Sequence, residues 1–254
     1  MSTSTDAELA RIRAEHTPAA IRDRLVTPAP HSYLRDFIYG AIDGTVTTFA
    51  IVCAAIGAQL SVGIVVVLGV ANLVADGFSM AASNYLGTRV DQQLRHRARR
   101  REEAHIATVP EGEREEIRQI FANKGFAGDA LDDAVAIITS DITRWVDTML
   151  QDELGLSLRG PSPARAAMVT FVAFVLIGAI PLLPFVAALA KPEWLTASFG
   201  ASVVLTAAAF LIVGAIKSRI VGERWLTSGL ETLGLGGLAA ALAYGVGALL
   251  RTVA

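Results

Sequence analysis

Long apolar runs separated by short polar breaks dominate the pattern of this 254-residue chain. Five runs approach the roughly 20 residues with which an α-helix crosses the hydrocarbon core of a bilayer. They occupy residues 37–59, 62–88, 165–190, 194–216 and 228–250. A helix satisfies its backbone hydrogen bonds internally, as lipid requires of a spanning segment. The pattern therefore predicts an all-α membrane protein with five transmembrane helices.

The stretch between the second and third runs is charged and contains no spanning segment. We expect a cytoplasmic helical domain over residues 89–164. The other parts are then an N-terminal cytoplasmic segment over 1–34, transmembrane helices one and two over 35–88, and transmembrane helices three to five over 165–254. Within the N-terminal segment, the spacing of apolar residues predicts one helix over 6–25.

Basic residues set the expected orientation, because Lys and Arg collect on the cytoplasmic side of membrane proteins. They cluster before the first span, after the second, before the third and after the fourth. This distribution places the N-terminus in the cytoplasm and the C-terminus outside.

In the third span, Pro181 and Pro184 predict a kink, since each removes a backbone donor.

The amino-acid composition also bears on the class of protein. Charged residues make up 18% of the chain, whereas soluble domains have about 25%. The net charge of -2 argues against nucleic acid as a partner. The single cysteine, Cys53, excludes an intrachain disulfide framework and a Cys-rich zinc site.

Polar residues gather on one face of each of the first two spans. Residues three, four or seven apart share a helix face, which groups Asp43 with Thr47 in the first span. The second span carries a similar stripe: Asn72, Asp76, Met80, Ser83 and Asn84. Intramembrane acids usually mark an ion or proton pathway. The alternative is that Asp43 and Asp76 only pack helices, protonated or paired with hydroxyl groups.

The types of possible ligand in these two stripes indicate which cation would cross the membrane. Carboxylates and carbonyls suit hard cations, whereas a thioether favours softer transition metals. Met80 beside the acids therefore favours Fe²⁺ or Mn²⁺ over Mg²⁺ or Ca²⁺. Methionine is also a common gap-filling core residue, so packing remains the alternative interpretation of Met80.

Three further pairs of possible ligands lie in the charged stretch. They are Glu102 with His105, Glu113 with Glu116, and Met149 with Glu153. At spacings of three or four, each pair would lie on one face of its own helix. Pro110 separates the first two helices, and Gly125 and Gly128 interrupt the chain before the third. Neighbouring helices that project Glu and Glu-x-x-His ligands can build a metal site, although charged helix faces are more often simply solvated.

Four segments carry a similarity to known proteins. They are DFIYGAIDGTVTTFAIV, GVANLVADGFSMAASNYLGT, the Glu-rich helices that end in MLQDELGL, and TFVAFVLIGAIPLLPF. Together they resemble the vacuolar iron transporter family, from about Leu34 to the C-terminus. The resemblance implies a homodimer of five-span protomers with the metal path between the copies. It also implies a multi-pass protein of the bacterial cytoplasmic membrane that moves ferrous iron, and possibly manganese, out of the cytoplasm in exchange for protons.

The resemblance also implies roles for individual residues. Asp43 and Met80 match the translocating residues, and Asp36 matches a carboxylate near the cytoplasmic mouth. The set that matches the cytoplasmic metal-binding helices is Glu102, Glu113, Glu116, Met149 and Glu153. His105 replaces a carboxylate there, and Asn72 and Asn84 stand where some relatives carry Glu. Metal is cargo in this interpretation, with no resident cofactor and no enzymatic activity. A membrane-anchored ferroxidase and a metal sensor without transport are the alternatives.

Overall fold

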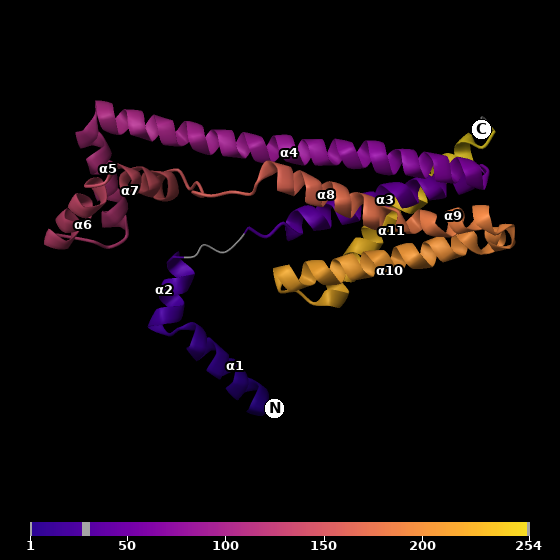
Figure 1. Ribbon diagram of the computed structural model, residues 1–254, viewed down its shortest axis with the longest axis horizontal. Helices are drawn as coiled ribbons and strands as arrows, with labels where there is room; N and C mark the ends of the chain where they lie inside the picture. The colour runs from indigo at the N-terminus through magenta and orange to yellow at the C-terminus, as the bar shows by residue number, and fades with distance from the viewer. Residues whose placement is uncertain (1, 27–30, 253–254) are drawn as a thin grey trace. The chain divides into compact units, whose positions relative to one another are not determined.

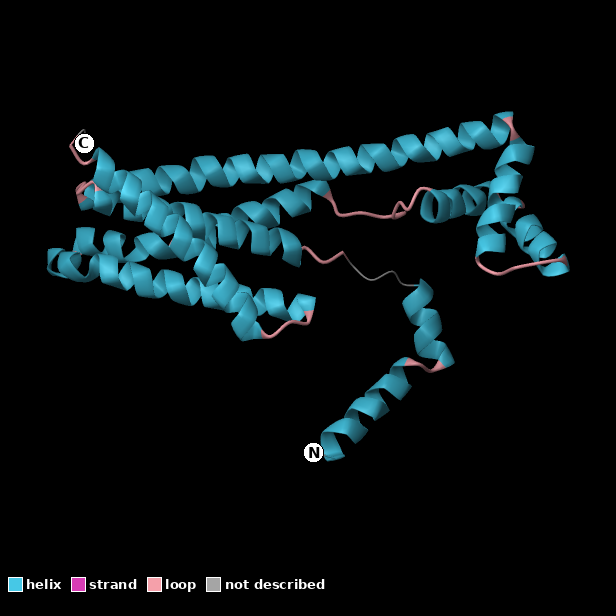
Figure 2. Ribbon diagram, turned by 180° about the vertical axis from the view of Figure 1, so that it is seen from behind, coloured by secondary structure: helices cyan, strands magenta, loops and turns pink. Residues whose placement is uncertain are grey.

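The structure, a computed structural model, describes residues 2–26 and 31–252. Within these ranges the chain is helix or connecting loop, and no strand occurs (Figure 2). The prediction of an all-α protein is confirmed for this part of the chain. Two separate units are present, one ending at Ser32 and one beginning at Tyr33.

The first unit contains two helices, α1 (Ser2–Glu15) and α2 (Pro18–Val26). The single helix predicted over 6–25 is therefore wrong. Pro18 starts a new helix because its ring fits the first helical position and disfavours a helical residue before it. Thr17 caps the new helix, with its Oγ1 accepting the N–H of Ala20 at 3.3 Å.

The second unit contains the five helices that are long and apolar enough to cross a membrane, which confirms the predicted number for the described residues (Figure 1). The first is α3 (Leu34–Gly57), and the second is the start of α4 (Val62–Thr108). The third joins α8 (Pro163–Gly178), the 3₁₀ turn η2 (Ile180–Leu182) and α9 (Leu183–Ala190). After the short η3 (Pro192–Trp194), α10 (Leu195–Val221) and α11 (Trp225–Leu250) complete the set.

Helix α3 lies at the centre of these helices and packs against α8 and α11. Two glycines set its distance from α8. A Cβ at Gly40 would lie 2.2 Å from the carbonyl oxygen of Thr170, and one at Gly44 would lie 2.5 Å from that of Phe174. Small residues let membrane helices approach this closely. Polar side chains on the same part of α3 are thereby held against α8.

The predicted kink in the third span is present at η2, between α8 and α9. Pro181 and Pro184 supply no backbone donors there, so the α-helical hydrogen bonds cannot continue. Ser202 of α10 donates to the carbonyl oxygen of Pro181 at 2.7 Å. A neighbouring helix thus satisfies part of the interrupted backbone.

Helix α4 does not end with the second span. It runs for 47 residues without a break, a length of about 70 Å. Its charged second half follows Gly87 with no proline and with many good helix formers, so nothing in the sequence stops it. Glu102 and His105 therefore lie on the same helix as Met80, and not on a separate helix as predicted.

We call the far half of α4, together with α5 (Pro110–Asn123), α6 (Asp129–Thr139), α7 (Ile142–Thr148) and η1 (Met149–Glu153), the inter-span helices. They have an apolar core of their own. Its buried members are Ile106, Ile117, Val135, Trp145, Val146, Met149 and Leu150. Pro110 begins α5, as predicted.

The segment that carries Met149 and Glu153 is a π-helix and not the α-helix expected from the sequence. The N–H of Leu154 bonds to the carbonyl of Met149 five residues earlier, at 3.2 Å. This wide turn lets Leu154 and Leu156 join the apolar core while Glu153 stays at the surface. Turns of this type occur often at functional sites.

Candidate functional site

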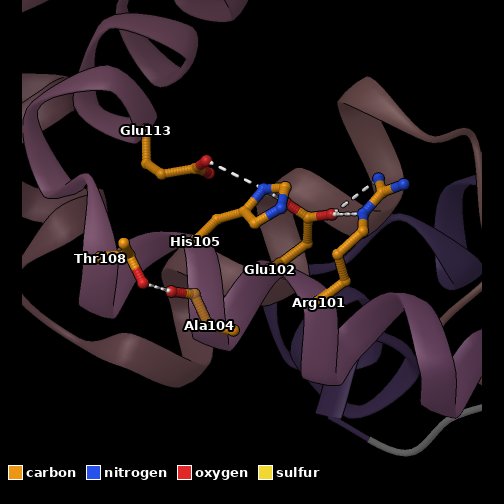
Figure 3. A network of polar contacts seen from close by, with 6 residues as sticks. All are labelled: Arg101, Glu102, Ala104, His105, Thr108 and Glu113. Atoms are coloured by element: carbon orange, nitrogen blue, oxygen red, sulfur yellow. Dashed lines mark hydrogen bonds and ion pairs between the residues drawn. The ribbon is translucent and has the colours of Figure 1, made fainter.

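The inter-span helices bring three possible metal ligands together, Glu102 and His105 from α4 and Glu113 from α5. One ligand atom from each lies within 4.8 Å of the others, and no other group of this kind occurs in the ranges 2–26 and 31–252. The turn at Val109 and Pro110 folds α5 back so that Glu113 faces the last turns of α4. Figure 3 shows the His105 ring between the two carboxylates.

The two carboxylates of this group are buried, which is unusual for glutamate. Glu102 is 1% exposed and Glu113 is 6% exposed. His105 Nδ1 lies 3.3 Å from Glu113 Oε1 and 3.8 Å from Glu102 Oε2. The other oxygen, Glu113 Oε2, is buried without a hydrogen-bond partner. An unsatisfied buried acceptor costs about 1–3 kcal/mol, and a cation or a donor bound at this oxygen would remove that cost.

Arg101 was not among the predicted site residues, but it contacts the site directly. Its Nε donates to Glu102 Oε1 at 3.0 Å, and its Nη2 lies 2.9 Å from the same oxygen (Figure 3). Adjacent residues of a helix do not normally face each other, so helical spacing does not predict this pair. Arg101 neutralises one oxygen of Glu102 and would compete with a bound cation.

Two further predicted ligands, Glu116 and Glu153, affect the ionisation of this group through their negative charge. Burial raises the pKa of Glu113, and the negative charges of Glu116 and Glu102 raise it further. The pKa of Glu153 is also raised, first by partial desolvation and then by Glu102 and Glu116. Carboxylates crowded in this way resist ionisation. A divalent cation would relieve that repulsion.

Met149, the last predicted ligand of this region, lies fully buried in the apolar core of the inter-span helices. It is one π-turn away from Glu153, which is exposed. In this structure Met149 packs against apolar neighbours and is not part of the group formed by Glu102, His105 and Glu113.

In the spans, the predicted polar stripes of α3 and α4 face each other at one contact. Asn72 Nδ2 lies 3.4 Å from Thr47 Oγ1, and Thr47 in turn donates to the backbone carbonyl of Asp43 at 2.8 Å. Asp43 of α3 and Asp76 of α4 carry the carboxylates of these two stripes. Both side chains are partly buried.

A second contact between the spans joins three helices. Asn84 Nδ2 of α4 donates to Asp36 Oδ1 of α3 at 2.8 Å and to Thr170 Oγ1 of α8 at 2.7 Å. The oxygen of the Asn84 amide accepts from Thr88 Oγ1 at 3.3 Å. The sequence analysis did not identify Thr170, because a single threonine in an apolar run has no periodic pattern.

Met80 and Ser83 complete the predicted set. Met80 is partly buried and packs against the apolar cluster that includes Phe49, Leu73 and Phe174. Ser83 is exposed on the surface of α4. Within the described part of this protomer, the membrane acids do not gather into a group of three carboxylate, imidazole or thiolate ligands.

Comparison with known proteins gives the family. The model of the VIT family matches residues 34–248, which is most of the chain. The chain belongs to the VIT family. The VIT match covers all five candidate spans and the inter-span helices. The resemblance noted in the sequence is thereby confirmed.

Individual VIT relatives show the same extent of similarity. Vacuolar iron transporter 1 of Arabidopsis thaliana is 35% identical over 214 residues, 83% of each chain. Vacuolar iron transporter 2 of Oryza sativa subsp. japonica is 32% identical over 223 residues, 87% of this chain and 88% of the relative. The vacuolar iron transporter of Toxoplasma gondii is 32% identical over 233 residues, 89% and 77% of the two chains.

Membership of the VIT family, whose members are transporters, confirms two predictions made from the sequence. The protein is a multi-pass membrane protein, in agreement with its five apolar helices. It is a transporter and not an enzyme.

Proposed function

We propose that this protein exports ferrous iron, and also Mn²⁺, from the cytoplasm in exchange for protons. Metal transport is supported by the VIT match and by relatives that are named vacuolar iron transporters. The observation that carries the metal specificity is the group of Glu102, His105 and Glu113, with its unsatisfied buried oxygen on Glu113. The imidazole of His105 favours Fe²⁺ over Mg²⁺ and Ca²⁺, and the two carboxylates also suit Mn²⁺.

The inter-span helices would lie in the cytoplasm and capture metal there. The Arg-rich part of α4 that follows the second span supports this side, because such clusters stay cytoplasmic. Glu116 and Glu153 would increase the local negative charge around the three ligands, and a focused field raises the local concentration of cations. In this proposal Met149 maintains the core beneath the ligands.

Asp36 would receive the metal at the cytoplasmic mouth of the spans. Asn84 donates to only one of its oxygens, Oδ1. Thr170 holds the Asn84 amide from the other side. The second carboxylate oxygen of Asp36 would then be available to a cation.

Asp43 would couple the two ions deeper in the membrane. A single carboxylate can bind a divalent cation when ionised and release it when a proton from the opposite side neutralises it. Asp76 lies close enough to influence Asp43 electrostatically. Met80 would add a soft ligand that favours Fe²⁺.

The membrane site would be completed by a second copy of the chain. Only 22% of the most apolar stretch of α4 is buried within the protomer. One exposed face of this helix carries small residues at every fourth position: Ala71, Ala75, Ser79, Ser83 and Gly87. Such faces let helices pack closely. Because Asp43 and Asp76 are costly next to lipid, a homodimer that covers this side of α4 accounts for both features.

Transport by the reconstituted full-length protein tests the proposed function. Vesicles with an acidic interior should accumulate Fe²⁺ under anaerobic conditions, and also Mn²⁺, several times faster than vesicles without a pH gradient. Internal pH, followed with a trapped dye, should rise as metal enters. Metal uptake that is indifferent to the pH gradient would contradict proton coupling. The absence of metal uptake under both conditions would contradict transport itself.

A further inference from the structure

A small basic cavity lies beside α4, immediately beyond the second span. Its volume is about 140 Å³. The polar part of its lining comes from Gln92, Arg95, His96 and Arg99 of α4, and from Ser157 and Gly160 of the segment that leads into α8. No residue of the metal group belongs to it, so the cavity is a separate feature of the inter-span helices.

The position of the cavity along the chain places it near the membrane surface. Arg95 follows Thr88, where the apolar run of α4 ends, by seven residues, which is about 10 Å along a helix. The opposite wall ends at Pro161, two residues before α8 begins. Headgroup layers extend about 5–8 Å beyond each side of the hydrocarbon core. The cavity is therefore within reach of lipid headgroups.

The basic side chains of the cavity are only partly neutralised. Arg99 is paired with Asp147 of α7. Arg95 is half-buried, and no carboxylate of the described residues lies within salt-bridge distance of its guanidinium. A charged group that is partly removed from water without a counter-charge is unfavourable. An anion bound to the guanidinium of Arg95 would supply the missing counter-charge.

Gly160 lets the guanidinium of Arg95 lie against the backbone. A Cβ at this position would be 2.3 Å from Arg95 Nη2 and 2.7 Å from its Cζ. The planar donors of arginine match phosphate oxygens in pairs. His96 and Gln92 lie one turn or less from Arg95 on α4, and each can add a donor to the same oxygen atoms.

We propose that this cavity binds the phosphate group of an anionic phospholipid. Basic residues next to a transmembrane helix attract anionic lipids. The apolar side chains of Leu156 and Leu158, which also line the cavity, suit the glycerol end of a lipid better than free inorganic phosphate. A bound headgroup would join α4 to the segment that leads into the third span.

Lipid binding by the delipidated full-length protein in detergent tests this proposal. The probes are phosphatidylglycerol, phosphatidylcholine and inorganic phosphate, with binding read by native mass spectrometry and by the shift in melting temperature. The variant is Arg95→Gln, and Arg95→Lys keeps the charge but loses the planar fork. Arg97→Gln is the matched control, because Arg97 is exposed on the same helix and does not line the cavity.

The wild-type protein should bind phosphatidylglycerol at least about tenfold more tightly than phosphatidylcholine, which corresponds to one well-placed charged hydrogen-bonding group. Arg95→Gln should abolish that preference, Arg95→Lys should keep a part of it, and Arg97→Gln should leave it within about twofold of wild type. Equal losses in Arg95→Gln and Arg97→Gln would overturn the proposal, because diffuse surface charge would then explain binding. Stabilisation by inorganic phosphate without any by phosphatidylglycerol would overturn the lipid assignment.

Discussion

The group on the inter-span helices and the polar stripe in the spans differ in how complete they are within one protomer. On the inter-span helices, Glu102, His105 and Glu113 converge within 4.8 Å. In the spans, Asp43, Asp76 and Met80 remain separate and partly exposed. A site that holds an ion can be built within one chain, whereas a site that passes an ion onward benefits from walls that can move. If both regions bind metal as proposed, the inter-span helices should hold it more tightly, because their three ligands already converge.

The largest expected effect comes from Asp43→Asn, which keeps the volume and removes the charge. Metal flux into vesicles should fall roughly 100-fold or more, since the charge at this depth has no replacement in the protomer. Metal binding by the inter-span helices should stay unchanged. Thr206→Val, which alters a buried polar residue of α10 outside both stripes, is the control and should transport normally. Near wild-type flux in Asp43→Asn would show that this carboxylate only packs helices.

A second change separates capture from passage. Replacing Glu113 and Glu116 together with Gln should weaken Fe²⁺ or Mn²⁺ binding to the inter-span helices by about 10–100-fold, the usual cost of a lost ligand or its neighbour. Transport should slow at low metal concentration and recover at saturation. Calorimetry and concentration-dependent flux measure the two effects.

The control for this double variant is Glu111→Gln with Glu115→Gln. These residues lie on the same helix, are exposed, and pair with Arg114 and Arg118 away from the metal group. The control should bind metal like the wild type. If both double variants bind metal as well as wild type, α5 presents only a solvated acidic surface.

A smaller effect, in the opposite direction, is expected from Arg101→Gln. Removing the cation that contacts Glu102 Oε1 should strengthen metal binding roughly threefold, because Arg101 is half exposed and water weakens its attraction to the buried Glu102. Arg100→Gln is the control, because it removes the same charge from an exposed neighbouring position that forms no ion pair with any described residue. Weaker metal binding in Arg101→Gln would mean that Arg101 orients Glu102 for the metal.

The smallest expected effect is a pH dependence of the metal-free protein. The pKa values of Glu113 and Glu153 are raised above their ordinary value of 4.5, so the folded state binds these protons more tightly than the unfolded state. Their stabilising contribution is complete below pH 4.5 and is lost as the pH rises through the raised values. Acidification from neutral pH toward that window should therefore raise the melting temperature of the metal-free protein.

Bound metal should reverse this pH trend, since its ligands must be deprotonated. Thermal scans with and without Mn²⁺ test both directions. The metal-free rise should be much reduced in the double Gln variant of Glu113 and Glu116, which removes one of the two shifted groups and a charge that acts on both. An unchanged pH dependence in that variant would place its origin elsewhere in the protein.

The sequence was sufficient for features that depend on long or regular patterns. The five spans follow from runs of about 20 apolar residues, and the polar stripes and Glu-rich pairs follow from helical spacing. Helical spacing did not predict contacts between residues that are far apart in the sequence, nor contacts between neighbours in the sequence. Thr170 of α8 meets Asn84 of α4 because these two helices pack against each other, although the residues are 86 positions apart in the sequence. Arg101 reaches Glu102 through its long flexible side chain, which periodicity does not describe.

Local breaks were also difficult to predict. Whether Met149 and Glu153 share a helix face depends on how Leu154 and Leu156 pack, and that packing produces a π-helix. The end of the second span was set at residue 88 because polarity changes there, yet a change in polarity does not stop a helix. Only an unfavourable residue such as Pro110 does.

The unbroken path of α4 gives the two regions a fixed angular relation. Asn84 and Glu102 are 18 residues apart on this helix, which is about five full turns and about 27 Å. The same side of one helix therefore places an amide beside Asp36 of α3 and a carboxylate within 4.8 Å of Glu113 of α5. A helix resists stretching and unwinding, so a rotation of this helix at the Glu102 end would swing Asn84 through the same angle.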